Sequence, residues 1–414
     1  MVAPIGWNEV KVADAIVDSF SGPSPTCLER NIQGDEWGVF KTTCSTKEQG
    51  WDYTKHKVLP RAFWGMTRSL IEVGDTVITK AGPRHRVGIA SFVDRTLDRL
   101  IVSGKMIGLR PNNSVVYPPF LALALSSKPT QEFLNQRTTG MAESQVNFEN
   151  VALLETTLYL PSLKEQKAIA EALSDADAAI ESLDALIEKK RDVKQATMQQ
   201  LLTGRTRLPG FTADWKEVRL GDLGSTFGGL TGKSSKDFGD GNSSFVTFMN
   251  VMSNVVLNNQ GTEKVRIGNG ERQSQLLEGD VIFNGSSETP EEVGFGSAVP
   301  TELSGIYLNS FCFGFRRKDT KSLDPKFFAY LTRSPLGRDI IRPMAQGSTR
   351  YNIAKTNLLN GRFPLPPLKE QEAIAEALTV MDDELEALTE QVSKLRMMKE
   401  GMMQDLLTGK VRLV

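Results

Sequence analysis

The sequence is poor in the side chains that support metal binding and acid–base catalysis. Its 414 residues include two histidines, His56 and His85, and three cysteines, Cys27, Cys44 and Cys312. The cysteines lie far apart and form no CxxC pair, so no familiar zinc spacing is present, and free thiols in a reducing cytoplasm are expected. Two histidines also leave little room for His-based catalysis. The sequence therefore predicts a cytoplasmic protein without a metal site, and composition leans away from an enzyme.

Long apolar runs and an excess of charge of one sign are also missing. No apolar stretch reaches the roughly 18 residues that a membrane-spanning helix needs. Residues 1–9 have neither the basic nor the apolar region of a signal peptide. The net charge of −1 gives no overall attraction to nucleic acid. Any nucleic-acid-binding surface must therefore be local.

One segment resembles a P-loop, the phosphate-binding motif, but lacks a required glycine. Residues 228–234 end in Gly-Lys-Ser, as a P-loop does, but Phe227 stands five residues before Gly232, where the motif requires glycine. No clear apolar strand precedes the loop. We also find no Asn-Pro-Pro-Tyr methyltransferase motif, no GxSxG elbow and no carboxylate cluster with metal spacing. The chain is expected to be catalytically silent, with an NTPase at this loop as a remote alternative.

What the sequence does contain is one segment written twice. Residues 160–208 open with Leu-Pro-Ser-Leu-Lys-Glu-Gln, and residues 365–413 open with Leu-Pro-Pro-Leu-Lys-Glu-Gln at an offset of 365 − 160 = 205. Both copies close with Leu-Leu-Thr-Gly at the same offset. The repeat predicts four segments, which are 1–159, 160–208, 209–364 and 365–414. Two similar repeat copies, each preceded by a divergent segment, suggest a protein that recognises two different targets at a fixed separation.

Each copy of the repeat has the periodicity of a long helix. Apolar residues recur at alternating intervals of three and four, which is the seam of a coiled coil. Because each helix has one seam, we expect the two copies to pair with each other. The expected pairing residues are Ile169, Leu173, Ile180, Leu183, Ile187, Ile374, Leu378, Leu385, Leu388, Val392 and Leu395. The first copy turns polar at Lys190, Lys194 and Thr197, which is expected to loosen that end of the pairing.

Helix length and connectivity predict the orientation of the pair. Each helix is about 40 residues and so roughly 60 Å long, which a compact domain of about 150 residues would strain to bridge. The helices should therefore run antiparallel, with one divergent region at each end and an internal two-fold axis. Ser162 and Glu165 fit a capping box, and Gly204 and Gly409 supply left-handed stops. The Lys-Glu-Gln runs have two interpretations, helix capping and a docking face for partner subunits.

The two divergent regions share short motifs and are expected to share a fold. Trp7, Asp75 and Gly88 stand in runs that are echoed around Trp215, Asp280 and Gly294. These runs are short, β-rich and bounded by Gly, Asp and Pro turns, whereas residues 324–331 have the pattern of a capped helix. We therefore predict an α+β protein with two mixed domains that have the same fold and different surfaces.

Basic side chains cluster in loops of both regions. Arg and Lys contact phosphates or guanine edges, and Asn contacts adenine edges. A solvated surface is the alternative for each loop. The first region has Glu143 where the second has Arg350, which makes a phosphate contact there doubtful. The candidate DNA-binding residues are Lys80, Arg84, His85, Arg86, Arg316, Arg338, Arg342, Ser348, Arg350, Tyr351 and Asn352.

Over its whole length the chain resembles the specificity (S) subunit of Type I restriction–modification systems. The matching motifs are the two Leu-Pro-x-Leu-Lys-Glu-Gln-x-x-Ile-Ala-x-x-Leu openings at Leu160 and Leu365, the two Leu-Leu-Thr-Gly closings, and the Gly-Asp-x-Val-Ile-like strands. The resemblance implies two target recognition domains, each reading one half of a bipartite target in double-stranded DNA. It also implies paired helices that fix the spacer and dock two methyltransferase (M) subunits.

The resemblance further implies that chemistry resides in partners. S-adenosylmethionine is expected on the M subunits, and ATP and Mg on restriction (R) subunits that join the full complex, with no cofactor on this chain. A non-DNA adaptor, whose two heads bind proteins around a helical hinge, is the alternative from another class, and the near-neutral charge is its best support.

Overall fold

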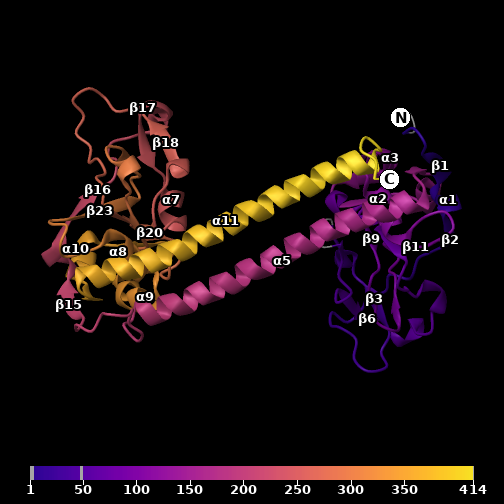
Figure 1. Ribbon diagram of the computed structural model, residues 1–414, viewed down its shortest axis with the longest axis horizontal. Helices are drawn as coiled ribbons and strands as arrows, with labels where there is room; N and C mark the ends of the chain where they lie inside the picture. The colour runs from indigo at the N-terminus through magenta and orange to yellow at the C-terminus, as the bar shows by residue number, and fades with distance from the viewer. Residues whose placement is uncertain (1–3, 47–49, 414) are drawn as a thin grey trace. The chain divides into compact units, whose positions relative to one another are not determined.

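The computed structural model describes residues 4–46 and 50–413. It divides into two compact units, unit 1 with residues 1–184 and 391–414, and unit 2 with residues 185–390. Both divisions fall inside long helices, α5 (Leu163–Leu201) and α11 (Leu368–Leu407). Each unit therefore holds one mixed domain and half of each long helix (Figure 1). The α+β class with two long helices is confirmed, whereas the proposed four-segment division stays a prediction.

The described residues of unit 1 form a domain centred on a four-stranded antiparallel sheet in the order β2-β11-β7-β9. These strands are β2 (Ile16–Phe20), β11 (Met106–Pro111), β7 (Thr76–Thr79) and β9 (Ala90–Phe92). Smaller sheets contain β10 (Leu100–Ile101), β3 (Gly38–Phe40) and β6 (His56–Val58), then β12 (Thr139–Ala142), β13 (Gln145–Asn147) and β8 (Ala81–Gly82). Two-stranded pairs are β1 (Asn8–Lys11) with β14 (Thr157–Leu160), and β4 (Ser45–Thr46) with β5 (Gly50–Trp51). The short helices are α1 (Val12–Ala15), α2 (Pro118–Ser126), α3 (Lys128–Asn135) and α4 (Asn150–Leu154).

Unit 2 repeats the central topology of unit 1. Its main sheet has the order β16-β23-β19-β21, with β16 (Gly224–Gly228), β23 (Cys312–Arg317), β19 (Val281–Asn284) and β21 (Gly296–Ala298). The smaller sheets contain β18 (Thr262–Val265), β17 (Phe238–Val246) and β22 (Tyr307–Leu308), then β20 (Ser286–Ser287), β25 (Tyr351–Ile353) and β24 (Ala345–Gln346). β15 (Lys216–Arg219) pairs with β26 (Arg362–Leu365). The short helices are α6 (Leu220–Leu223), α7 (Phe248–Ser253), α8 (Pro325–Arg333), α9 (Pro335–Ile341) and α10 (Lys355–Asn360).

The hydrophobic core of each unit includes both long helices. In unit 1 the first turns of α5, with Ile169 and Leu173, pack with Leu406 from the last turn of α11. In unit 2 Leu202, just after α5, packs with Leu378 of α11. Burial of each such side chain contributes roughly 1.5–3 kcal/mol. The start of one helix and the end of the other therefore complete the core of the same unit.

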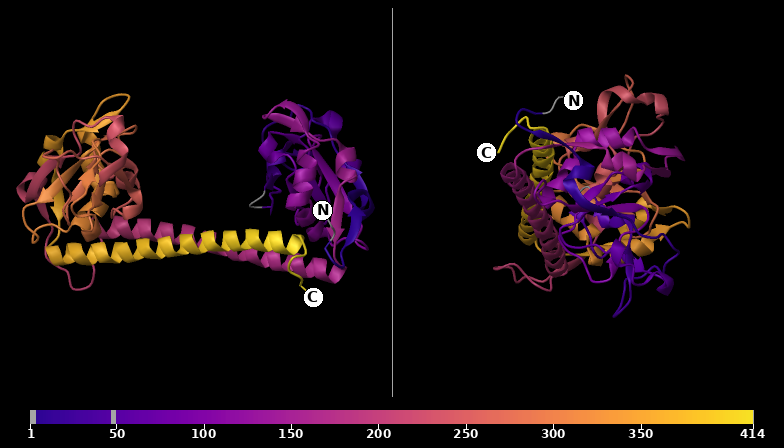
Figure 2. Two further views of the ribbon diagram at one scale, coloured as in Figure 1. Left: turned by 90° about the horizontal axis from the view of Figure 1, so that it is seen from above. Right: turned by 90° about the vertical axis from the view of Figure 1, so that its right-hand side faces the viewer.

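Inside each unit the two helix segments run antiparallel (Figure 2). Residue numbers fall along α11 as they rise along α5 in the ion pairs that connect the two segments. In unit 1 the pairs are Glu165–Arg412, Asp177–Lys399 and Asp184–Arg396. In unit 2 they are Lys190–Glu384, Lys194–Asp382 and Arg207–Glu370. The antiparallel orientation is thus confirmed within each unit.

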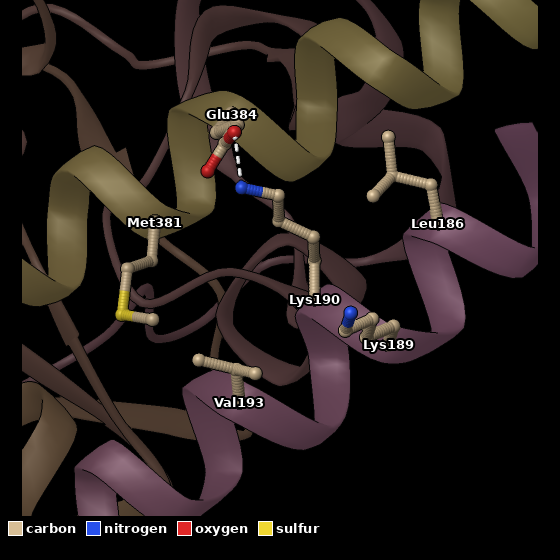
Figure 3. Close-up of a pocket in the computed structure, with 6 residues that line it drawn as sticks. All are labelled: Leu186, Lys189, Lys190, Val193, Met381 and Glu384. Carbon is tan, nitrogen blue, oxygen red and sulfur yellow. Dashed lines mark hydrogen bonds and ion pairs between the residues drawn. The ribbon is translucent and has the colours of Figure 1, made fainter.

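Four of these ion pairs follow the repeat offset, in two corresponding sets. Arg207–Glu370 in unit 2 corresponds to Arg412–Glu165 in unit 1, because 207 + 205 = 412 and 165 + 205 = 370. Lys194–Asp382 in unit 2 corresponds to Lys399–Asp177 in unit 1, because 194 + 205 = 399 and 177 + 205 = 382. Ion pairs stand at Lys190 and Lys194, where the first copy turns polar, as Figure 3 shows for Lys190 and Glu384. The expected loosening of that end of the pairing stays a prediction.

The eleven expected pairing residues all lose exposure in the structure. The buried ones are Ile169, Leu173, Ile180, Ile187, Ile374, Leu378 and Val392. The half-buried ones are Leu183, Leu385, Leu388 and Leu395.

The helix ends are formed as the sequence predicts, with one exception. Gly204 and Gly409 have φ of +68° and +66°, the left-handed backbone that glycine adopts most easily. The Ser162 hydroxyl accepts a hydrogen bond from the Glu165 amide at 3.3 Å. The Glu165 carboxylate binds the Arg412 guanidinium at 2.6 Å. It therefore supplies an ion pair instead of the second bond of a capping box.

A buried glutamine attaches each long helix to its domain. The Gln166 carbonyl accepts from the Tyr117 amide at 2.8 Å, where α2 begins. In unit 2 the Gln371 carbonyl accepts from the Asp324 amide at 2.9 Å, where α8 begins. Gln166, Gln371 and Glu165 are each 1% exposed. Their contacts favour the structural interpretation of the Lys-Glu-Gln runs over a docking face.

Candidate nucleic-acid interface

A two-stranded hairpin, β24–β25, carries one group of exposed polar side chains in unit 2. Gly347 turns the chain with φ of +124°, and β25 also pairs with β20 through Ser287 opposite Tyr351. Ile353 is buried and fixes the end of the hairpin to the core. The side chains left exposed are those of Gln346, Ser348, Thr349, Arg350 and Asn352.

Two residues outside the hairpin extend this surface. The Arg350 guanidinium lies 5.7 Å from the centre of the Phe311 ring, and that ring is 57% exposed. Gly285 connects the elements, because its amide donates to Phe311 O at 2.9 Å and its carbonyl accepts from the Ile353 amide at 3.1 Å. Exposed Lys355 follows at the start of α10. We call Phe311, Ser348, Arg350, Asn352 and Lys355 the unit 2 surface.

Unit 1 has the same connections with different side chains. The Lys80 amide donates to Lys105 O at 2.9 Å, and its carbonyl accepts from the Phe148 amide at 3.1 Å. Lys80 therefore occupies the place of Gly285, and Lys105 the place of Phe311. The Lys80 ammonium binds the Asn150 side chain at 3.1 Å. The exposed residues of this unit 1 surface are Arg84, His85, Lys105, Gln145 and Asn147.

The loop beside each surface has the opposite charge in the two units. Residues 80–87 of unit 1 carry three cations, and residues 285–293 of unit 2 carry three carboxylates. The cations are Lys80, Arg84 and Arg86, and the carboxylates are Glu288, Glu291 and Glu292. Cations suit phosphates and guanine, whereas carboxylates accept from the cytosine amino group. The two loops therefore differ in the charged groups that they carry.

Three of the arginines expected to face DNA have internal partners. Arg86 donates to Thr42 O at 2.6 Å and to Ser45 O at 2.8 Å. Arg316 binds the buried Asp280 carboxylate at 2.6 Å, which raises the pKa of its guanidinium above the ordinary value. Arg316 also stands at the far end of β23 from Phe311.

Arg338 is also held by contacts within unit 2. Its guanidinium donates to Val293 O at 2.6 Å and lies 5.0 Å from the Phe295 ring centre. Burial lowers the pKa of Arg338 to about 10. Arg86, Arg316 and Arg338 therefore bind groups within their own unit, and direct contact of these three with DNA stays a prediction.

The remaining predicted residues are accessible. Arg84 lies in a 3-10 turn (Arg84–Arg86) and forms an exposed ion pair with Glu143 at 2.9 Å. The acidic residue noted in the sequence of the first region thus offsets the charge of Arg84. His85 and Arg342 are exposed, and Tyr351 is half-buried.

Sequence reasoning missed Phe311, Lys105 and Lys355. Phe311 directly precedes the apolar run of β23, so the sequence pattern does not distinguish it from a core residue. Phe311-Cys312 and Lys105-Met106 each stand where a glycine-containing strand begins. Alignment of these two strands is the signal that could have found Phe311 and Lys105. The exposure of all three becomes evident only from the tertiary contacts.

The P-loop-like segment, residues 228–234, makes contacts within unit 2. The Lys233 ammonium binds the Glu271 carboxylate and Arg266 O, each at 2.6 Å. The hydrogen bond from Lys233 lowers the pKa of Glu271 to about 2. Within residues 4–46 and 50–413 no group of three His, Cys, Asp or Glu side chains could hold a metal ion. Over the same residues, no helix is both long and apolar enough to cross a membrane.

Several known proteins with similar sequences are specificity subunits of type I restriction enzymes. Residues 69–189 and 212–394 match the family model of the type I restriction modification DNA specificity domain. A putative type I restriction enzyme MjaX specificity subunit from Methanocaldococcus jannaschii is 26% identical over 82% of this chain and 79% of that protein. The EcoEI specificity subunit from Escherichia coli is 27% identical over 46% of this chain, a match that spans 32% of that subunit.

Solved structures show the same fold. The S subunit of a type I system from M. genitalium superposes with a TM-score of 0.60 at 15% identity, covering 98% of this chain and 99% of that chain. The HsdS subunit from Thermoanaerobacter tengcongensis superposes with a TM-score of 0.51 at 19% identity, covering 99% of both chains. The matched segments cover most of both units. This chain therefore belongs to the family of type I restriction–modification DNA specificity subunits.

Proposed function

We propose that this chain reads a bipartite target in double-stranded DNA, with one half-site for each unit. The observation that carries the proposal is the duplicated surface, in which one backbone arrangement presents Phe311, Arg350 and Lys355 in unit 2 but Lys105 and Gln145 in unit 1. Phosphate contacts position a protein on DNA, and side chains that differ at equivalent places specify different bases. The long helices set the spacer between the half-sites.

The paired helices are also the proposed docking site for two M subunits. Val193 and Met398 occupy the same place in the repeat, since 193 + 205 = 398, and their side chains are 48% and 61% exposed. A groove of 260 Å³ lies beside Val193 in unit 2, lined also by Leu186 and Met381 (Figure 3). Exposed apolar side chains at matched places support two equivalent contacts.

The proposed chemistry belongs to the partners. S-adenosylmethionine would be bound by the M subunits, and ATP and Mg by R subunits in a complete complex, whereas this chain would supply only sequence recognition. The cytoplasm is the proposed location, because Cys27, Cys44 and Cys312 are free thiols, which suits a reducing compartment.

Replacement of Arg350 or Lys355 by alanine is expected to weaken DNA binding by the complex of this chain with its M subunits. Each cation that contacts a phosphate releases about one counterion, so each variant lowers the slope of log K against log salt by about 0.9. The measurement is fluorescence anisotropy with a duplex that contains the target, over a series of salt concentrations.

Arg272→Ala is the matched control, because Arg272 is an exposed cation of unit 2 outside the hairpin. It should keep the salt slope of the unmodified chain. A slope that is unchanged in Arg350→Ala and Lys355→Ala alike would remove the unit 2 surface from the DNA interface.

A further inference from the structure

An exposed aromatic ring in unit 2 has no counterpart in unit 1. Phe311 is 57% exposed, whereas the equivalent place in unit 1 holds exposed Lys105. An exposed apolar ring gains free energy when it is covered, and aromatic side chains are enriched where interfaces derive most of their affinity. The ring therefore marks a chemical difference between what the two units contact.

The backbone of Phe311 is held from both sides. Its amide donates to the Asn309 side-chain oxygen at 2.8 Å, and its carbonyl accepts from the Gly285 amide at 2.9 Å. Cys312, the next residue, begins β23 in the main sheet. The ring therefore projects from a fixed turn, and little backbone entropy is lost when a ligand covers it.

Charge beside the ring indicates what covers it. The Arg350 guanidinium lies 5.7 Å from the ring centre, a distance at which a cation is attracted to the aromatic face. Asn352 is exposed on the same hairpin as Arg350, and Lys355 is exposed at the start of the helix that follows. An apolar group bordered by cations and an amide matches the major groove, where the thymine methyl lies beside phosphates and polar base edges.

We propose that Phe311 packs against the 5-methyl group of a thymine in the half-site read by unit 2, and so determines specificity at one base pair. Arg350 holds the ring in place and contacts the adjacent DNA backbone. Lys105 gives unit 1 no equivalent methyl contact. The inference rests on the proposed DNA-reading function and names one chemical group that unit 2 recognises.

The test replaces each thymine of the target, one at a time, by deoxyuridine, which lacks only the methyl group. The probe is the target duplex, and the protein is the full chain in complex with its M subunits. With the unmodified chain, one substitution in one half-site should weaken binding about fourfold, as expected for one buried methyl group. In Phe311→Ala, binding should weaken about tenfold and the deoxyuridine effect at that position should vanish.

Three further variants separate methyl contact from general damage. Phe311→Leu keeps an apolar side chain and should keep sensitivity to the methyl group. Lys105→Ala should leave the effect of deoxyuridine at that position unchanged. Met249→Ala removes another exposed apolar side chain of unit 2, 64% exposed on α7, and should match the unmodified chain throughout.

Three results would overturn the inference. A scan in which no deoxyuridine weakens specific binding leaves DNA reading intact and removes the methyl contact. Retention of the effect in Phe311→Ala assigns the methyl contact to another residue. Absence of sequence-specific binding by the unmodified complex would overturn the proposed function together with this inference.

Discussion

Removal of one heptad from each long helix should shorten the spacer between the two methylated half-sites by about three base pairs and leave both half-sites unchanged. Seven helical residues span about 10 Å, and base pairs are about 3.4 Å apart. The deletions are residues 180–186 and 390–396, which remove Asp184 and Arg396 together. The spacer is read from the methylated motif of a host that expresses the deleted chain with its M subunit.

The ion pairs guide the choice of these deletions. Asp177–Lys399 in unit 1 and Lys190–Glu384 in unit 2 lie outside the removed residues. Because seven residues equal one heptad, each apolar seam stays in phase. Deletion of 180–186 alone is the control, since it shifts the register of one helix and should abolish methylation. An unchanged spacer after the matched deletion would contradict the proposal that the helices measure it.

Gln371→Ala should lower the free energy of local unfolding at the start of α11 by about 3 kcal/mol. The Gln371 amide donates to Pro366 O at 2.9 Å and to Ser322 O at 3.3 Å, and its carbonyl accepts from the Asp324 amide at 2.9 Å. Alanine leaves these groups without their partner in a buried place, where each unsatisfied group costs about 1–3 kcal/mol. Hydrogen exchange of residues 368–378 should accelerate about a hundredfold.

The repeat supplies the matched variants for this experiment. Gln166→Ala should accelerate exchange of residues 163–173 in unit 1, because Gln166 makes the corresponding bonds to Tyr117 and Pro161. Gln391→Ala is the control, since Gln391 is exposed on α11. Equal exchange in Gln371→Ala and Gln391→Ala would show that the buried glutamine does not hold the helix to its domain.

The long helices could be predicted from sequence because their signals are local or periodic. The apolar seam around Ile374 and Leu378 follows from intervals of three and four residues. Gly204 marks the end of the first long helix, because glycine adopts the left-handed backbone that ends helices. The repeat offset then made two similar domains the simplest arrangement. These features depend on nearby residues, so no tertiary contact had to be known.

Features that depend on distant residues could not be predicted. Lys194 was read as a gap in the seam because its partner Asp382 is 188 residues away. Arg338 was read as a surface cation, although carbonyl groups and a ring from residues about 45 positions earlier surround it. Phe311 carries no local sequence signal of its own, and its exposure follows from a turn made by Asn309 and Gly285. For a charged or aromatic side chain, the partner and not the residue type decides the role.

The most direct test of DNA reading is the methylome of a host that expresses this chain with the M subunit of its own system. The comparison is the same host with the M subunit alone, after complex formation has been verified by co-purification. A new bipartite methylated motif that appears only when this chain is present is the predicted result. Such a motif would also show that the M subunit docks on this chain. A stable complex without any new motif would contradict DNA reading and would favour the adaptor function.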